Sequence, residues 1–288
     1  MSESSLEGRT CLVTGASSGV GEQTALGLAR RGAHVVLVCR SRERGERSRA
    51  TIVRASGNPA VQLQLADLSS QAAIRQLAKE ILASVPAIHV LVNNAAVVNL
   101  RRATTIDGLE ATFAVNHLAY FLLTNLLLER IVASAPARIV NVASDGHKFG
   151  RLDFDDLQLD RRYSWWRAYT ASKLANVLFS AELARRLDGS GVTVNCLHPG
   201  AVASRLAHNN GRFAKVVTAL LKPFFLSSAQ GAATSIWAAS SPEVAGLSGC
   251  YFEKRKAVPA STAARDEVMA KRLWQESCHL TGLAHDSL

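Results

Sequence analysis

The chain has 288 residues, of which 48% are hydrophobic, and it carries a formal net charge of +10 at neutral pH. This length and apolar content predict one large globular core and exclude a disordered chain. The basic residues are spread along the sequence, and no basic block is interleaved with aromatic residues, so we expect no nucleic-acid binding. The five cysteines are odd in number and far apart, which predicts free thiols in a reducing compartment.

The first residues of the chain contain no apolar stretch of the kind found in a signal peptide. The longest apolar stretches, 120–128 and 216–226, are interrupted by polar residues and are shorter than the roughly 20 apolar residues of a membrane-spanning helix. We therefore expect a cytoplasmic protein. Its net positive charge leaves a weak, peripheral association with an anionic membrane surface as a second expectation.

Short apolar segments alternate with helical ones along most of the chain. Strands are expected at 10–14, 34–39, 61–65, 89–92, 138–142, 192–197 and 250–252, with helices between them. This alternation predicts an α/β fold, in which parallel strands are joined by crossover helices. We expect a single Rossmann-type, doubly wound domain over 1–288, with a seven-stranded, mostly parallel sheet and helices on both faces.

The alternation becomes irregular between residues 202 and 226, where Asn209, Asn210 and Gly211 mark a break. A segment at this late position in a doubly wound domain commonly covers the substrate site, so we expect 202–226 to be a substrate lid. Its apolar residues leave two alternatives open, which are packing in the core and contact with a membrane surface.

A glycine-rich turn joins the first expected strand to the first expected helix, with the spacing G-x-x-x-G-x-G. Glycines permit a tight turn and let backbone amides approach a pyrophosphate at the amino terminus of a helix. The turn therefore predicts a dinucleotide site, and a glycine-rich turn without a ligand is the structural alternative. The residues of this predicted site are Gly15, Ser17, Ser18, Gly19, Val20 and Gly21.

The residues after the second strand indicate which dinucleotide would bind. NAD sites commonly place a carboxylate there for the ribose 2′-hydroxyl, whereas the 2′-phosphate of NADP calls for an arginine. Arg40 follows the strand directly, and no carboxylate occurs before Glu43. We therefore predict NADP(H), with Arg40 as the main phosphate partner. Exposed arginines that merely open a polar helix are the alternative.

Tyr169 and Lys173 are separated by four residues in a segment with helical periodicity, which places the phenol and the ammonium on one face. A lysine cation beside a phenol favours the phenolate and brings it towards the working range of a general acid or base. Such a pair is more often an exposed, solvated pair, so its interpretation depends on the other motifs of the chain.

These motifs together resemble the short-chain dehydrogenase/reductase family, over nearly the whole chain. The resemblance rests on the glycine turn and, in order, on Asp67, Asn93 to Ala96, Asn116, Ser144, Tyr169, Lys173, Pro199 and Gly200. Cys39 and Arg40 at the end of the second strand and the longer segments 116–124, 172–179 and 197–200 resemble the retinol dehydrogenase branch. The branch resemblance implies an NADP(H)-dependent oxidoreductase that transfers hydride between the nicotinamide and a hydrophobic aldehyde, ketone or alcohol. A steroid-type or other ring-ketone reductase is the enzymatic alternative, and a nicotinamide-binding scaffold or sensor with little turnover is the non-enzymatic one.

The family resemblance implies a role for each matching residue. Tyr169 would exchange a proton with the substrate oxygen, and Lys173 would lower the pKa of that phenol and hold the nicotinamide ribose. Ser144 would polarise the carbonyl, and Asn116 would fix a water that relays protons to Lys173. A strand-end turn and a helix irregularity are the structural alternatives for Ser144 and Asn116. The other implied cofactor contacts are Asp67, Leu68, Asn94, Ala95, Ala96, Pro199, Gly200 and Val202.

Two further expectations concern metals and oligomers. His147 and His198 lie near the predicted site, but no other ligand stands at metal-binding spacing, so we expect no metal. The family resemblance also implies a homodimer that pairs through the helices expected at 109–131 and 169–187.

Overall fold

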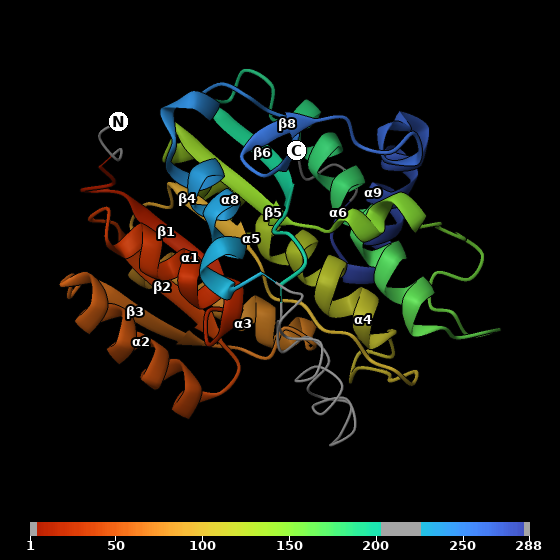
Figure 1. Cartoon of the computed structure of the whole chain (residues 1–288). Helices are drawn as coiled ribbons and strands as arrows, with labels where there is room; N and C mark the ends of the chain where they lie inside the picture. The colour runs from red at the N-terminus through yellow and green to blue at the C-terminus, as the bar shows by residue number, and fades with distance from the viewer. Residues whose placement is uncertain (1–4, 203–225, 285–288) are drawn as a thin grey trace.

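The computed structural model describes residues 5–202 and 226–284, which share one eight-stranded sheet. The strand order is β3-β2-β1-β4-β5-β6-β7-β8, and every neighbouring pair is parallel except β7 and β8. This order confirms the doubly wound Rossmann-type fold that the sequence predicts (Figure 1). The strands are β1 (Thr10–Thr14), β2 (His34–Cys39), β3 (Val61–Leu65), β4 (Val90–Asn93), β5 (Ala137–Val142), β6 (Val192–His198), β7 (Tyr251–Glu253) and β8 (Lys256–Val258).

The sheet contains one strand more than the seven expected from the sequence. The extra strand, β8, has three residues and returns antiparallel to β7 through Lys254 and Arg255. Both turn residues have positive φ angles, of 50° and 61°. A three-residue strand after two charged residues carries too little alternation of apolar and polar residues to be recognised from the sequence.

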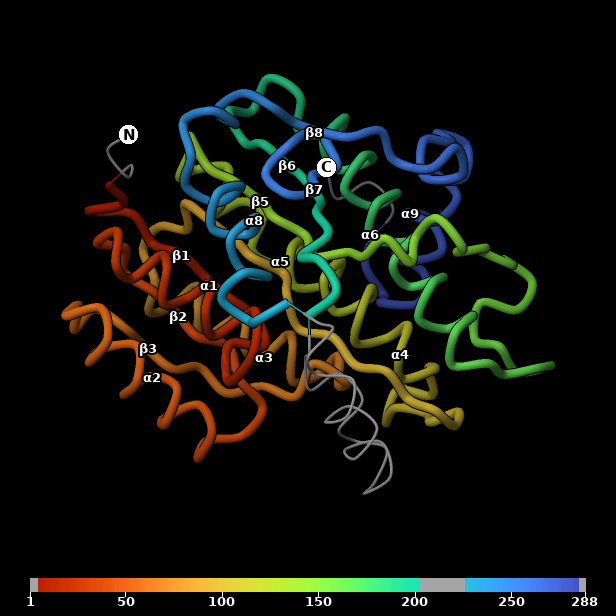
Figure 2. Tube along the Cα trace, in the orientation of Figure 1, coloured from red at the N-terminus to blue at the C-terminus, as the bar shows by residue number. Residues whose placement is uncertain are grey.

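Helices cover both faces of the sheet. On one face α1 packs against α2 and α8, and on the other α3 packs against α5 and α6 against α9 (Figure 2). Residues of each strand alternate between the two faces, as Leu12 and Val13 of β1 illustrate. The helices are α1 (Gly19–Ala29), α2 (Arg42–Ser56), α3 (Gln71–Ser84), α4 (Ala111–Phe113), α5 (Ala119–Ala133), α6 (Trp165–Arg186), α8 (Ser228–Ser240) and α9 (Glu267–Thr281).

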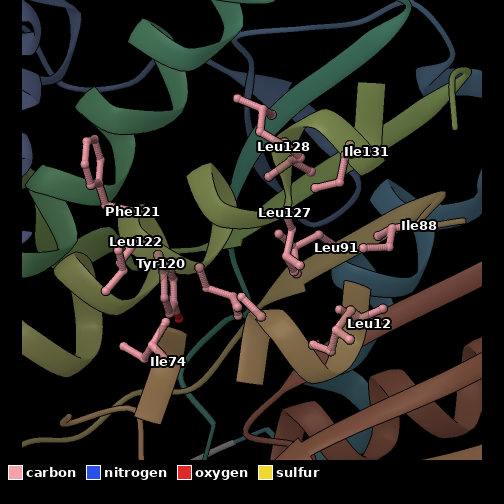
Figure 3. Close-up of a cluster of buried hydrophobic side chains, with 14 of the residues drawn as sticks. Leu12, Ile74, Ile88, Leu91, Tyr120, Phe121, Leu122, Leu127, Leu128 and Ile131 are labelled. Carbon is pink, nitrogen blue, oxygen red and sulfur yellow. The ribbon is translucent and has the colours of Figure 1, made fainter. Parts of the chain in front are cut away.

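The larger part of the core lies between the sheet and the α3, α5 and α6 layer. Figure 3 shows Leu12 of β1 and Leu91 of β4 on the sheet side of this core, with Ile74 of α3 and Leu127 of α5 among the helix side chains beside them. All four side chains are almost completely buried. Burying side chains of this size contributes about 1.5 to 3 kcal/mol each, so this layer holds the helices at fixed positions on the sheet.

The single helix predicted over 109–131 is divided by a π-helical turn. The chain passes from α4 into a π-helix, Ala114–Leu118, and then into α5. Among the described residues, 111–133 forms one helical segment long and apolar enough to span a membrane, and it is longer than the 120–128 stretch noted in the sequence. However, 83% of its most apolar window is buried inside the protein, as in the core helix of a globular domain.

A buried chain of polar contacts joins the π-helical turn to α6 and α9. The His117 ring contacts Asn176 Oδ1 through Nδ1 at 3.3 Å and Ser277 Oγ through Nε2 at 2.9 Å. Asn176 Nδ2 in turn donates to the carbonyl of Asn116 at 2.8 Å. Because an amide oxygen accepts, Nδ1 of His117 carries the proton and Nε2 accepts from the serine hydroxyl. This network orders the π-helical turn, and burial favours the neutral form of the histidine within it.

We predict that His117 makes folding stability depend on pH. Burial lowers the pKa of His117 from 6.5 to about 4. The unfolded chain therefore binds the proton first as the pH falls, so the stabilisation is complete above pH 6.5 and is lost towards pH 4. The unfolding free energy of the parent should fall between about pH 7 and about pH 5, and that of His117→Gln should fall by roughly 2 kcal/mol less. Urea titration at the two pH values measures both.

The control is His279→Gln, which replaces an exposed histidine on α9. If His117→Gln and the parent lose stability equally over this pH range, the neutral buried state of His117 is contradicted.

Candidate active site

A cavity of about 410 Å³ opens at the carboxyl ends of the parallel strands, where β1 and β4 lie side by side. The chain leaves β1 towards β2 on one side and returns to β4 on the other, and such a switch point is the usual ligand site of an open α/β sheet. Every residue predicted to contact the cofactor lines this cavity, and so does Ser144. The structure therefore brings together residues that span the chain from Gly15 to Val202.

The glycine turn after β1 is packed so closely that side chains would not fit. A Cβ on Gly15 would lie 2.8 Å from Cα of Ala95, and its φ angle is +68°. A Cβ on Gly21 would lie 2.4 Å from Nδ2 of Asn94 and 2.5 Å from the carbonyl oxygen of Gly15. The turn therefore needs glycine both for its backbone conformation and for the close approach of the loop after β4.

Two polar residues of the predicted cofactor set also hold the framework of the cavity. Asn94 Nδ2 donates to the carbonyl of Thr14 at 2.8 Å, and Thr14 Oγ1 accepts from the backbone amides of Asn94 at 2.8 Å and Ala95 at 3.0 Å. The carboxylate of Asp67 accepts from the backbone amide and the hydroxyl of Ser69, at 3.0 and 2.8 Å. Both side chains are therefore fixed in place at the cavity wall.

The amino terminus of α1 lacks a side-chain cap. Ser18 occupies the N-cap position, but its hydroxyl accepts no hydrogen bond from the first turn. By contrast, α2, α3, α8 and α9 are each capped by the side chain at that position, namely Ser41, Ser70, Ser227 and Asp266. The amides of the first turn of α1 border the cavity, so they are the donors that a phosphate group requires.

The corner of the cavity beside β2 is positively charged. Arg40 and Arg44 both line it, and within the described parts of the chain neither forms an ion pair. Glu43 lies between them in sequence but contacts Arg47 at 3.4 Å and does not line the cavity. Two guanidinium groups without a carboxylate partner can bind a phosphate monoester in bidentate fashion. Arg44 was not among the residues predicted from the sequence.

Tyr169 and Lys173 of α6 meet Ser144 at the other end of the cavity. Lys173 is 2% exposed, its Nζ donates to the carbonyl of Val142 at 3.0 Å, and Nζ lies 5.8 Å from the centroid of the Tyr169 ring. Ser144 follows β5, and its Oγ accepts from the amide of Gly146 at 3.1 Å. The structure thus places a phenol, an ammonium and a hydroxyl together, as the sequence predicts.

The electrostatics of this cluster differ from the sequence expectation in one respect. Lys173 was expected to lower the pKa of Tyr169, but burial raises that pKa, and the hydrogen bond with Ser144 only partly opposes the effect. Burial also lowers the pKa of Lys173 to about 8, because its ammonium is removed from water. Tyr169 is therefore protonated at neutral pH, which is the form that donates a proton to a carbonyl oxygen.

Asn116 lies in the π-helical turn and does not line the cavity. Its Oδ1 accepts from the amide of Val97 at 2.8 Å, and its Nδ2 donates to the carbonyl of Val97 at 3.0 Å and to Ser172 Oγ at 3.1 Å. Its own carbonyl accepts from Asn176. Asn116 therefore ties the loop after β4 to α6, and its expected role in a water relay stays a prediction.

Two histidines lie near the site and differ in their hydrogen bonds. His147 is buried, its Nε2 accepts from the amide of Ser261 at 3.2 Å, and its Nδ1 therefore donates to the carbonyl of Ser144 at 2.8 Å. His198 lines the cavity, and its Nδ1 has no hydrogen-bond partner among the residues with described positions. These positions include no group of three or more His, Cys, Asp or Glu side chains that could hold a metal ion.

Several lining residues were missed by the sequence reasoning. Most lie at the carboxyl end of a strand or shortly after it, which is the signal that could have identified them, because all parallel strands end at this edge. They are Val38, Arg44, Ala66, Val97, Val115, Val142, Ala143 and Ala201. His198, which was expected near the site but not as a cofactor contact, also lines the cavity. The expected lid, 202–226, lies outside the described residues apart from its ends, where Val202 forms an isolated parallel bridge with Leu226.

Comparisons with known proteins agree with this geometry. The family model for short chain dehydrogenase matches residues 9–214. The chain is 44% identical to retinol dehydrogenase 12 of Mus musculus over 278 residues, covering 96% of this chain and 88% of that protein. It is 45% identical to retinol dehydrogenase 11 of Homo sapiens over 281 residues, covering 98% and 88%.

Two solved structures also share the fold of this chain. An uncharacterised protein from Mycobacterium paratuberculosis superposes with a TM-score of 0.80 at 34% identity, covering 98% of this chain and 97% of that one. The active-site complex of RhlG with NADP from Pseudomonas aeruginosa has a TM-score of 0.69 at 28% identity, covering 88% and 97%. The chain therefore belongs to the short-chain dehydrogenase family, in its retinol dehydrogenase branch, and is an oxidoreductase acting on CH–OH or C=O groups.

Proposed function

We propose that the protein transfers hydride between NADP(H) and a hydrophobic aldehyde, ketone or alcohol. One observation carries this proposal: a single cavity joins a phosphate-binding helix terminus and a pair of arginines to the cluster of Ser144, Tyr169 and Lys173. The first two features suit a phosphorylated dinucleotide, and the third suits proton exchange with an oxygen atom.

The arginine corner favours NADP(H) over NAD(H). Arg40 and Arg44 would bind the 2′-phosphate, and the residues at this corner include no carboxylate positioned to accept from a ribose 2′-hydroxyl at the end of β2. The structurally similar RhlG forms an active-site complex with NADP, which supports the same assignment here. The bound nicotinamide would supply or accept the hydride.

The residues around the reacting oxygen would each act at a defined atom. Ser144 Oγ would orient the substrate oxygen, and the hydroxyl of Tyr169 would donate a proton to it in reduction and remove one in oxidation. The ammonium of Lys173 would stabilise the phenolate that forms when the proton leaves. Asn116 would keep Lys173 in place by tying α6 to the loop after β4.

The wall near these groups supports a hydrophobic substrate. Val97, Val115, Val142, Ala143 and Val202 line the cavity with apolar surface, and a retinol dehydrogenase is the relative that recurs in the comparisons. The segment 202–226 would act as the lid over the substrate. A reductase for steroid-type or other ring ketones remains the second enzymatic candidate.

We further propose one domain over 1–288, a cytoplasmic location with weak contact to membrane surfaces, and a homodimer. The net charge of +10 supports attraction to anionic lipids. The aromatic faces of α5 and α6 around Phe121 and Phe179 are already covered by Trp274 of α9, with ring centroids 4.9 and 6.0 Å apart. A homodimer through these helices would therefore use their remaining surface.

Replacing Arg40 by alanine should change the cofactor preference. We expect Arg40→Ala to raise the KM for NADPH roughly 10- to 100-fold, because a charge-assisted contact to the 2′-phosphate is lost, and to leave the KM for NADH unchanged. Arg47→Ala, which removes an exposed arginine paired with Glu43, is the control. Equal KM values for the two cofactors in the parent enzyme would refute the NADP(H) assignment.

Replacing Tyr169 by phenylalanine should separate binding from chemistry. We expect Tyr169→Phe to bind NADPH normally, as measured by fluorescence titration, and to lose turnover by roughly 10²- to 10⁴-fold, since the proton donor is gone. Tyr120→Phe is the matched control, because Tyr120 is 1% exposed and its hydroxyl has no partner among the described residues. A near-normal rate in Tyr169→Phe would favour a different proton donor, and a parent without turnover would favour a scaffold or sensor.

A substrate series should distinguish the two enzymatic candidates. With NADPH we expect kcat/KM to rise with chain length along a series of aliphatic and polyene aldehydes, because each added methylene buried against the apolar wall strengthens binding. Steroid ketones, measured under the same conditions, provide the comparison. Activity confined to small polar carbonyls would overturn the hydrophobic-substrate proposal, and higher kcat/KM on steroid ketones would favour the ring-ketone candidate.

A further inference from the structure

A second cavity, of about 540 Å³, lies at the opposite edge of the sheet from the cofactor cavity. It is bordered by the residues that open β1, β4, β5 and β6 and by the carboxyl end of α8. In Figure 1 these strands begin on the side of the molecule where the N-terminus is marked. Three basic residues line this cavity: Arg9, His89 and Arg138.

The parallel register places these three basic residues next to one another. The backbone amide of His89 donates to the carbonyl of Thr10 at 3.0 Å, directly beside Arg9, and the amide of Arg138 donates to the carbonyl of His89 at 2.8 Å. Neighbouring strands of a sheet are about 4.8 Å apart. Arg138 is in register with Val90, and Val90 with Cys11, so Arg9, His89 and Arg138 are staggered by one residue each at the amino ends of three neighbouring strands. The start of the strands therefore brings the three residues together, with Arg138 in β5 and with Arg9 and His89 directly before β1 and β4.

Each of the three side chains keeps donors that no residue of the described chain accepts from. Nη1 of Arg138 donates to the carbonyls of Ser241 at 2.8 Å and Ala238 at 3.2 Å, which leaves the other nitrogens of its guanidinium. Arg9 makes one long contact, from Nη1 to the carbonyl of Pro136 at 3.4 Å. His89 Nδ1 accepts from the amide of Thr10 at 3.0 Å, so the proton of the neutral ring is on Nε2.

The positive charge of this cluster has no carboxylate partner. In the parts of the chain with described positions, no ion pair involves Arg9, His89 or Arg138. Asp188 lines the same cavity but is exposed and is not paired with any of them. Burial and, second to it, the neighbouring charge of Arg9 lower the pKa of both Arg138 and His89, which indicates that Arg9 repels the charged form of each. A bound anion would remove this repulsion.

We propose that this cavity is a binding site for a phosphate-class oxyanion. A tetrahedral dianion offers several acceptor oxygens to two guanidinium groups and one imidazole N–H, and charge-assisted bonds of this kind are the strong ones. The same chemistry is offered by free phosphate or a soluble phosphate monoester, and by the phosphate of a lipid headgroup. The site is separate from the cofactor cavity and does not depend on the proposed function.

The test measures binding of inorganic phosphate to the full chain by isothermal titration calorimetry in a chloride buffer. Phosphate could also enter the corner of Arg40, so the titration is made with saturating NADP⁺ and repeated without cofactor on Arg40→Gln. We expect saturable binding in both titrations. Arg9→Gln and Arg138→Gln should weaken it by about tenfold or more, and Arg47→Gln should leave it unchanged.

Arg9→Gln keeps the test informative if Arg138→Gln fails to fold, because the Arg9 side chain makes a single long hydrogen bond to the described residues. No binding at millimolar phosphate, or equal binding by the parent and Arg9→Gln, would overturn the proposal. Sedimentation with vesicles that contain phosphatidic acid distinguishes the two sources. If the parent protein sediments with the vesicles and Arg9→Gln does so less, the site binds lipid phosphate. If the parent binds inorganic phosphate but does not sediment with the vesicles, the site binds a free anion.

Discussion

The close contact between the loops that follow β1 and β4 is the constraint on which the active site depends. Gly15 and Gly21 leave space that Asn94 fills, and Asn94 in turn donates to the carbonyl of Thr14. These contacts hold the turn at the topological switch point and leave the first amides of α1 directed to the cavity instead of to a side-chain cap. A larger residue at either glycine would separate the two loops and open the phosphate-binding end.

The reacting end of the cavity is held by a second set of contacts, made by buried polar side chains. Asn116 links Val97 to Ser172, and Asn176 fixes the carbonyl of Asn116 while it contacts His117. Asn116 and His117 lie in a π-helical turn, an irregularity that often marks functional sites. In the low-dielectric interior each unsatisfied group would be costly, so the network keeps α6 and the loop after β4 in one arrangement.

The two edges of the sheet carry different electrostatic features. At the carboxyl edge one cavity has a helix terminus and two arginines at one end and a half-buried phenol at the other. Burial raises the pKa of Tyr169 and lowers the pKa of Lys173. At the amino edge three basic side chains stand together without a carboxylate partner within the described residues. Both clusters follow from the parallel strands, because each of these begins at one edge of the sheet and ends at the other.

The sequence alone was sufficient for the fold class, because apolar strands, the helices between them and a glycine turn are local patterns. It also pointed, mostly through the family resemblance of motifs at strand ends, to cofactor residues that all line the cavity. It missed β8, whose three residues carry no clear alternation, and Arg44, whose position in the cavity depends on the direction of α2. It also could not give the electrostatics, since the pKa of Lys173 reflects burial by distant parts of the chain. The polar network around Asn176 and the basic cluster at the amino edge likewise required the tertiary structure, because their members are neighbours only after the strands and helices have packed.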